Sequence, residues 1–239
     1  MLKNRSIRFK AEDCLDLPKQ IFKRVPVEFP QSAITYYNTI RDKMKEHDMD
    51  KQALELNFAK MRQLSSGFLY QTDEDSGERL DITFSQNPKM DALVELLSDM
   101  PEDAKCVVFH EYIRTGELIE QTLKKKKYGV VRLWSGTKNH REVLRKFNEN
   151  KTTRVLAVNN ASGAQGLNLQ VANYVVFFES PVDPITRQQA EKRCHRPGQD
   201  KPVFYFDLIM KDSVDERIMA FLREGKNLMR AIIDGSEKV

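Results

Sequence analysis

Residues 154–178 read RVLAVNNASGAQGLNLQVANYVVFF, and this stretch decides the fold class. It begins and ends with short apolar runs, at 154–158 and 174–178, that are rich in valine and phenylalanine. Neither run alternates between apolar and polar residues, which indicates strands that are buried on both faces. Such strands occur in parallel sheets that helices cover on both sides. The stretch therefore predicts an α/β fold, with a glycine-containing loop between two strands.

The same alternation of strands and helices extends outward in both directions. Expected strands lie at residues 106–109, 130–134, 154–158, 174–178 and 203–209. Expected helices, from apolar residues at three- and four-residue spacing, lie at 89–97, 115–125, 141–148, 185–193 and 214–233. Ligands of a parallel sheet bind beyond the C-terminal ends of its strands, so we expect a functional site at that edge.

The first 86 residues follow a different pattern. An extended lead-in contains an expected edge strand at 24–29, where Pro26 suits an edge position. Two helices expected at 32–47 and 51–64 predict a helical hairpin, and the polar segment 72–79 (TDEDSGER) predicts a flexible loop. We therefore divide the chain into the lead-in (1–30), the hairpin with its loop (31–86) and an α/β domain (87–239).

Composition limits the classes of function. The 239 residues include 39 Lys+Arg and 35 Asp+Glu, for a net charge of +4, and 40% are hydrophobic. This apolar content excludes a disordered or collagen-like chain, and no apolar run approaches the ~20 residues of a membrane helix. The N-terminus lacks the apolar core of a signal peptide, so we expect a soluble intracellular chain. The small charge surplus does not by itself indicate nucleic-acid binding.

The sequence lacks the usual signatures of a metal site and of a primary nucleotide site. The three cysteines and four histidines form neither a CxxC pair nor an HExxH pattern, so we expect no metal bound by the protein alone. A P-loop requires GxxxxGK[ST], but the Gly225-Lys226 pair is followed by Asn227. We therefore expect no primary nucleotide-binding site.

Two segments have features that favour contact with an anion. Gly163 and Gly166 follow an expected strand and would let backbone approach a phosphate closely, although an ordinary glycine-containing connection is the alternative. On a helix that begins near residue 184, Gln189, Arg193 and Arg196 would share one face. Two arginines one turn apart suit phosphate oxygens, and a solvated basic helix face is the alternative.

The segment QQAEKRCHRPGQ at 188–199 resembles motif VI of the Swi/Snf-type ATPases, QAxxRxHRxGQ. The matching residues are Gln189, Ala190, Arg193, His195, Arg196, Gly198 and Gln199. The glycine loop resembles motif V, with matches at Gly163, Gly166, Leu167, Asn168 and Leu169. VVFHEY at 107–112 resembles motif IV, LWSGT at 133–137 resembles the stretch that follows it, and LDLP at 15–18 fits the entry to the second lobe.

This resemblance implies the second RecA-like lobe of a superfamily-two DNA translocase: a mainly parallel sheet with helices on both faces and a small helical hairpin. In that family the first lobe brings the P-loop and holds Mg²⁺, and the second brings arginine fingers. The implied catalytic residues are Arg193 and Arg196, with support for the ATP site from Gln189, Gly163, Gly166 and Asn168. The implied DNA-binding residues are Phe109, His110, Ser135, Gly136, Thr137 and Asn160.

The resemblance also implies ligands and partners. They are ATP and Mg²⁺ in the full-length enzyme, double-stranded DNA, and the N-terminal RecA-like lobe of the same polypeptide. For the isolated domain we expect no cofactor, no membrane, a monomer and no ATP hydrolysis, because it has no P-loop. The expected location is the cytoplasm of a prokaryote or a phage host, or the nucleus of a eukaryote.

Departures from the family pattern indicate a divergent, phage or bacterial, member. The family's aspartate and Trp-Asn-Pro segment reads Glu179-Ser-Pro-Val-Asp-Pro184, and Ala161 and Ala164 replace a basic residue and a glycine of motif V. One alternative function is a non-enzymatic module, derived from a helicase lobe, that binds nucleic acid or protein. Another is an unrelated α/β enzyme that uses the glycine loop for a small phosphorylated ligand.

Overall fold

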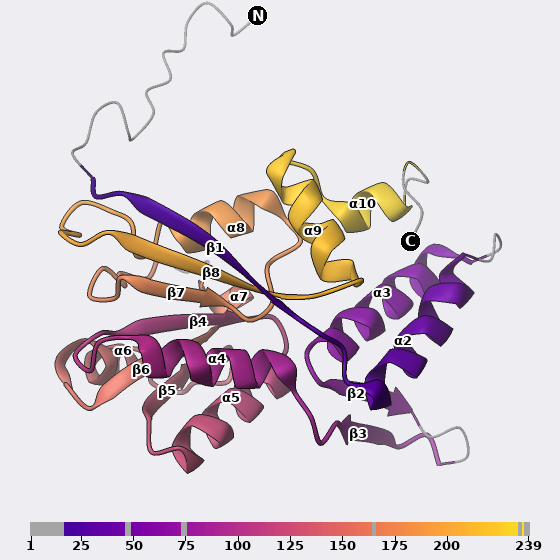
Figure 1. Ribbon diagram of the computed structural model, residues 1–239, viewed down its shortest axis with the longest axis horizontal. Coiled ribbons are helices and arrows are strands. Elements are labelled where there is room, and N and C mark those ends of the chain that lie inside the picture. Colours follow the sequence, from indigo (N-terminus) through magenta and orange to yellow (C-terminus); the bar gives the residue numbers. More distant parts are fainter. Residues whose placement is uncertain (1–16, 46–48, 73–75, 164–165, 234–235, 237–239) are drawn as a thin grey trace, which may run out of the picture.

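A six-stranded parallel sheet forms the centre of the computed structural model, which describes residues 17–45, 49–72, 76–163, 166–233 and 236 (Figure 1). The strand order is β1-β8-β7-β4-β6-β5, and every pairing within it is parallel. The strands are β1 (Gln20–Val27), β4 (Cys106–His110), β5 (Gly129–Leu133), β6 (Thr153–Asn159), β7 (Tyr174–Phe177) and β8 (Val203–Met210). The predicted α/β fold with a mainly parallel sheet is confirmed.

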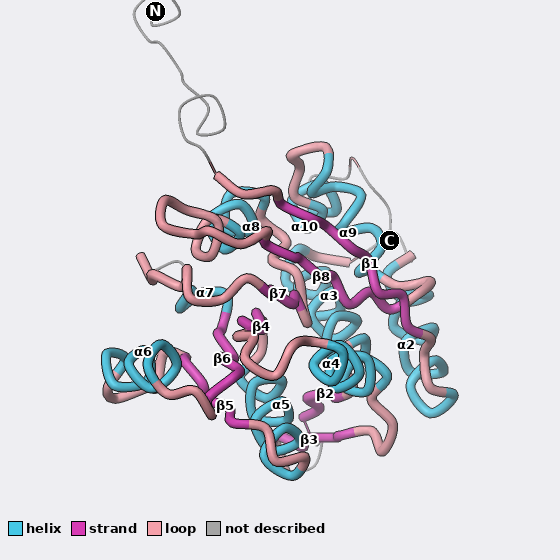
Figure 2. Tube along the Cα trace, turned by 60° about the vertical axis from the view of Figure 1, so that its left-hand side comes forward, coloured by secondary structure: helices cyan, strands magenta, loops and turns pink. Residues whose placement is uncertain are grey.

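Helices cover both faces of this sheet, as its apolar strands require (Figure 2). In β4, Cys106 and Val108 pack with α4 (Pro88–Asp99) and α5 (Ile113–Lys125). Val107 and Phe109 point to the other face, which is covered by α6 (His140–Glu149), α8 (Pro184–Glu191) and the connection that follows residue 165. Since both sets of side chains are buried, the strands show no polar alternation.

Strand β1 forms one edge of the main sheet, in register with β8 from Gln20 opposite Val203 to Val27 opposite Met210. Pro26 has no N–H to donate, which an edge strand tolerates. The predicted edge strand is confirmed, although it spans residues 20–27. The lead-in thus contributes a strand to the main sheet, and the proposed boundary at residue 30 stays a prediction.

The predicted helical hairpin is formed by α2 (Gln31–Met44) and α3 (Lys51–Ser65). It is followed by an antiparallel pair, β2 (Phe68–Thr72) and β3 (Arg79–Thr83), which the sequence analysis missed. The ends of the expected loop are therefore strand residues, since Thr72 pairs with Arg79, while residues 73–75 lie outside the described part. Neither strand has the continuous apolar run that marks the strands of the main sheet, because Gln71, Arg79 and Asp81 are polar.

The expected helix over 214–233 is divided into α9 (Val214–Arg223) and α10 (Leu228–Ile233). Gly225 adopts a φ of 67°, and its N–H donates to Leu222 O, while Lys226 N–H donates to Phe221 O. These two bonds form a Schellman motif, which ends a helix at a glycine. The break allows α9 and α10 to share one apolar cluster with α2 and α3.

None of the helices in the described ranges is long and apolar enough to cross a membrane. Within the same ranges, no group of three His, Cys, Asp or Glu residues could hold a metal ion.

Candidate functional site

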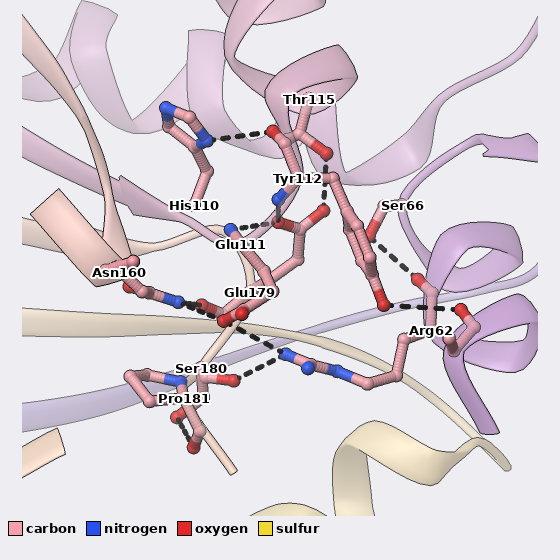
Figure 3. A network of polar contacts seen from close by, with 12 residues as sticks. Arg62, Ser66, His110, Glu111, Tyr112, Thr115, Asn160, Glu179, Ser180 and Pro181 are labelled. Carbon is pink, nitrogen blue, oxygen red and sulfur yellow. Dashed lines mark hydrogen bonds and ion pairs between the residues drawn. The ribbon is translucent and has the colours of Figure 1, made fainter. Parts of the chain in front are cut away.

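A buried carboxylate joins the C-terminal ends of β4 and β7 (Figure 3). Glu179, two residues after β7, is 2% exposed. Its Oε2 accepts hydrogen bonds from Glu111 N–H at 2.5 Å and Tyr112 N–H at 3.4 Å. Its Oε1 accepts a bond from Thr115 Oγ1 at 2.6 Å. Glu179 therefore fixes the turn that leads from β4 into α5.

Asn160 connects the end of β6 to the same turn. It begins α7 (Asn160–Gly163), and its Nδ2 donates to Glu111 Oε2 at 2.8 Å and to Glu179 O at 3.2 Å. The neighbouring Asn159 Nδ2 donates to Glu111 O at 2.6 Å. Asn160 is buried, and its Oδ1 has no hydrogen-bond partner among the described residues. The structure thus places this predicted DNA-binding residue at the expected edge, with its amide nitrogen already engaged.

His110, the last residue of β4, is fully buried at this edge. Its Nδ1–H donates to Tyr112 O at 3.0 Å, and its ring packs against Gly116, where a Cβ atom would lie 2.7 Å from Nε2. Burial lowers the pKa of His110 to about 4, because the imidazolium would lose its hydration. The bond to Tyr112 O opposes this effect without outweighing it.

The low pKa of His110 predicts that acid reduces stability. An unfolded histidine has a pKa of ~6.5, so as the pH falls toward 4 the unfolded state binds the proton first and the unfolding free energy decreases. We expect His110 to account for a decrease of up to about 3 kcal/mol over this interval. Urea unfolding at several pH values should show a flatter profile for His110→Gln than for the unaltered protein. Parallel profiles would contradict the assignment.

The side chains of Phe109 and His110 are not available to DNA. Phe109 is fully buried, and its ring stacks on Phe177 with centroids 5.2 Å apart. Both side chains are part of the core, and the assignment of this turn to DNA stays a prediction. A contact at this turn would have to use backbone.

The predicted DNA-binding residues 135–137 form a turn directly after β5. Ser135 and Gly136 are exposed, and Thr137 is half-buried. Thr137 Oγ1 accepts Trp134 N–H at 3.0 Å, and Thr137 N–H donates to Trp134 O at 3.0 Å. A Cβ atom at Gly136 would lie 2.4 Å from the Trp134 ring, so this tight turn requires glycine. Its open backbone suits a phosphate.

The glycine connection runs from the C-terminal end of β6 to the N-terminal end of β7. Gly163 ends α7, and Gly166 adopts a φ of 58°, which favours glycine. Leu167 and Leu169 are buried against the sheet, whereas Asn168 is exposed. The connection is therefore anchored by its leucines and presents polar groups outward; residues 164–165 lie outside the described part.

Arg193 and Arg196 lie in a turn, and the expectation that they share a helix face with Gln189 is wrong. Helix α8 ends at Glu191 with Lys192 as its C-cap, and Gln189 is exposed on the helix. Arg193 O accepts a hydrogen bond from Leu169 N–H at 3.1 Å. A continued helix could not have satisfied this carbonyl, because the residue four positions on is Pro197, which has no N–H to donate. Both arginines are half-buried.

The turn from residue 193 to residue 199, here called the arginine turn, is held by Gln199. The Gln199 Nε2 donates to Gln170 O at 2.9 Å, to Ala172 O at 3.0 Å and to Cys194 O at 3.3 Å. Burial raises the pKa of the Cys194 thiol to about 12, so it is a neutral core group. The arginine turn is therefore packed tightly onto the glycine connection.

The two predicted halves of the site lie at opposite ends of the parallel strands. His195 Nε2–H donates to Pro18 O at 2.7 Å, two residues before β1 begins, so the arginine turn lies at the N-terminal strand ends. Asn160 and the turn at 135–137 lie at the C-terminal ends. The glycine connection joins the two edges, and it is the structural link between the expected ATP and DNA residues.

Arg187 is a buried residue that the sequence analysis did not single out. Its Nη1 and Nη2 donate to the two carboxylate oxygens of Asp207 at 2.5 and 3.1 Å, and its Nε donates to Glu191 at 2.7 Å. The guanidinium lies 3.5 Å from the centroid of the Phe177 ring. A signal was present in the sequence, because Asp207 is a charged residue within the apolar run VFYFDLIM and requires a buried cation.

Known helicases and their structures are similar to this chain. Residues 88–198 match the family described as helicase conserved C-terminal domain. A DNA repair and recombination protein RAD54-like of Drosophila erecta is 35% identical over 137 residues, which are 56% of this chain and 17% of that protein. The fold matches a crystal structure of the C-terminal part of the Fun30 ATPase domain, with a TM-score of 0.73, 19% identity, and coverage of 92% of this chain and 98% of that one. Residues 88–198 therefore resemble a helicase C-terminal domain, and the fold is similar to that of these ATPase domains.

A further structure shares this fold. It is the Sulfolobus solfataricus SWI2/SNF2 ATPase core in complex with double-stranded DNA, with a TM-score of 0.69, 21% identity, and coverage of 95% of this chain and 48% of that one. The chain spans about a fifth or less of the length of the curated relatives that it matches. The match at 88–198 contains all of the predicted site residues, and it begins at Pro88, where α4 begins.

Proposed function

We propose that this chain is the second lobe of an ATP-dependent motor that translocates on double-stranded DNA. In this proposal Arg193 and Arg196 are arginine fingers that act on ATP bound to a first lobe. The observation that carries the proposal is the fixed backbone of the arginine turn, which Leu169 and Gln199 hold to the glycine connection.

A fixed backbone matters because phosphoryl transfer is accelerated mainly by positioning and by charge stabilisation. Guanidinium groups are planar, remain charged and match phosphate oxygens in geometry. A turn with defined hydrogen bonds places such groups more accurately than a solvated helix end. In the complete enzyme Mg²⁺ would be held by the first lobe, and Gln189, Gly163, Gly166 and Asn168 would line the second lobe's side of the cleft.

The DNA track is proposed for the C-terminal strand ends. The turn at 135–137 is exposed and is followed by the exposed Lys138 and by helix α6. Backbone N–H groups, small hydroxyl side chains and a nearby cation bind phosphates without reading sequence. Contacts of this kind suit a motor that must move along any sequence.

The first test is the enzymatic state of the isolated chain. We expect the purified 239 residues to release phosphate from ATP only at the background rate, with or without duplex DNA. The complete protein, with its first lobe, should show turnover that DNA stimulates. DNA-stimulated hydrolysis by the isolated chain would contradict the division of the active site.

The same assay separates the alternative functions. A complete protein that binds DNA and never hydrolyses ATP would indicate a binding module derived from a helicase lobe. Tight binding of a small phosphorylated ligand by the isolated chain would indicate an unrelated enzyme. The monomeric state and the location, in the cytoplasm of a prokaryote or phage host or in a eukaryotic nucleus, remain part of the proposal.

A further inference from the structure

Arg62 extends from the helical hairpin to the C-terminal edge of the main sheet (Figure 3). Its Nη2 donates to Ser180 O at 2.8 Å and lies 3.9 Å from Glu111 Oε2. The guanidinium is 5.8 Å from the centroid of the Tyr112 ring. Arg62 is buried on α3, and a buried cation is tolerated only where its partners are fixed.

Glu111 connects Arg62 to Asn160. The Glu111 Oε2 that faces Arg62 also accepts the bond from Asn160 Nδ2 at 2.8 Å. A second tie lies beside it, because Tyr112 Oη donates to Ala59 O on α3 at 3.2 Å. The hairpin therefore contacts the turn after β4 through both a charge pair and a neutral hydrogen bond.

The charges at this edge explain why the cation is needed. Two carboxylates, Glu111 and Glu179, lie near each other, and Glu179 is compensated by N–H and O–H donors of the α5 turn. Arg62 is the cation that faces the side chain of Glu111 within this network. Without it, Glu111 would turn toward water, and Asn160 would lose a fixed acceptor.

We propose that Arg62 is a positioning residue that fixes Asn160 and the start of α7 through Glu111. It thereby makes the helical hairpin and the DNA-facing edge a single mechanical unit. The DNA part of this inference rests on the proposed function, whereas the structural coupling does not.

Hydrogen exchange tests the coupling in the complete protein. Arg62→Met is compared with Gln63→Met, because Gln63 is also buried on α3 and its side chain accepts Tyr70 N–H, within residues 31–86. We expect amides 159–163 to exchange about tenfold faster in Arg62→Met than in the unaltered protein. The reason is that the charge-assisted hydrogen bond from Asn160 to Glu111 would be weakened, and such a bond changes a local opening equilibrium by about a factor of ten. Gln63→Met should leave these amides unchanged.

Two further variants guard against a general loss of fold. Arg62→Lys keeps the charge and should recover part of the protection at 159–163. Glu111→Gln keeps an acceptor for Asn160 while removing the charge, and its exchange should lie between those of the unaltered protein and Arg62→Met. Equal exchange at 159–163 in Arg62→Met and Gln63→Met would overturn the inference.

A second readout addresses DNA. In Arg62→Met the DNA concentration that half-saturates ATP turnover should rise severalfold, with a smaller change in the KM for ATP, because Arg193 and Arg196 lie at the opposite ends of the strands. An unchanged half-saturating DNA concentration together with faster exchange would overturn only the claim that Arg62 affects DNA binding. If DNA does not stimulate ATP turnover even in the unaltered protein, the proposed function fails. The hydrogen-exchange comparison still tests the coupling between Arg62 and Asn160.

Discussion

Replacing Arg196 with alanine in the complete protein is expected to lower DNA-stimulated ATP turnover by ~10³-fold or more, the factor that an arginine finger contributes. Arg193→Ala should have an effect of the same order. The backbone of the arginine turn is held by Leu169 and Gln199, so neither truncation should disturb the fold. Phosphate release at saturating DNA measures turnover. Binding of a fluorescent ATP analogue measures the nucleotide affinity of the first lobe, which should change little.

The matched control is Lys192→Ala. Lys192 is an exposed cation adjacent to Arg193, so its loss changes the net charge equally without removing a finger. Arg196→Lys should restore little activity, because an ammonium group cannot reproduce the guanidinium geometry. Turnover within tenfold of the unaltered protein for both alanine variants would exclude the finger assignment.

The largest expected effect on stability comes from Arg187→Met. This substitution leaves Asp207 buried without its bidentate partner, and breaking a buried ion pair costs about 3–5 kcal/mol. It also removes the contact with the Phe177 ring. Urea unfolding, followed by the fluorescence of the single tryptophan, Trp134, measures the change.

Two controls define this result. Arg223→Met, on the exposed part of α9, should alter the unfolding free energy by about 0.5 kcal/mol or less. The double variant Arg187→Met with Asp207→Leu should recover most of the loss, since an apolar replacement removes the unpaired charge. A loss below about 1 kcal/mol in Arg187→Met would mean that the pair contributes little.

Much of the sheet could be predicted because its strands are buried on both faces. Residues 106–109 and 174–178 carry apolar side chains at successive positions, and no other environment accommodates them as well. The helix ends were harder to predict. Gly225 ends α9 through a local motif that the sequence could have indicated. Pro197 was a second local signal, because it cannot donate to Arg193 O, which is bonded instead by Leu169 N–H from another segment.

The candidate site was predictable in part. The arginines and the glycines were found from their residue types and their order in the chain. Phe109 and His110 were assigned to DNA, yet their side chains are in the core, because their orientation depends on which face of β4 each one occupies. The network of Arg62, Glu111 and Glu179 was not predicted, since its members are far apart in sequence.

The sequence by itself determined the α/β class, the helical hairpin and the two motifs, because apolar periodicity and motif spacing are local properties of the chain. Only the tertiary structure decided which groups meet. Parallel crossovers bring the ends of β4, β6 and β7 together and place the arginine turn at the other edge of the sheet. Hydrogen bonds between these distant segments then set what holds the arginine turn and what Asn160 contacts, and no local pattern encodes them.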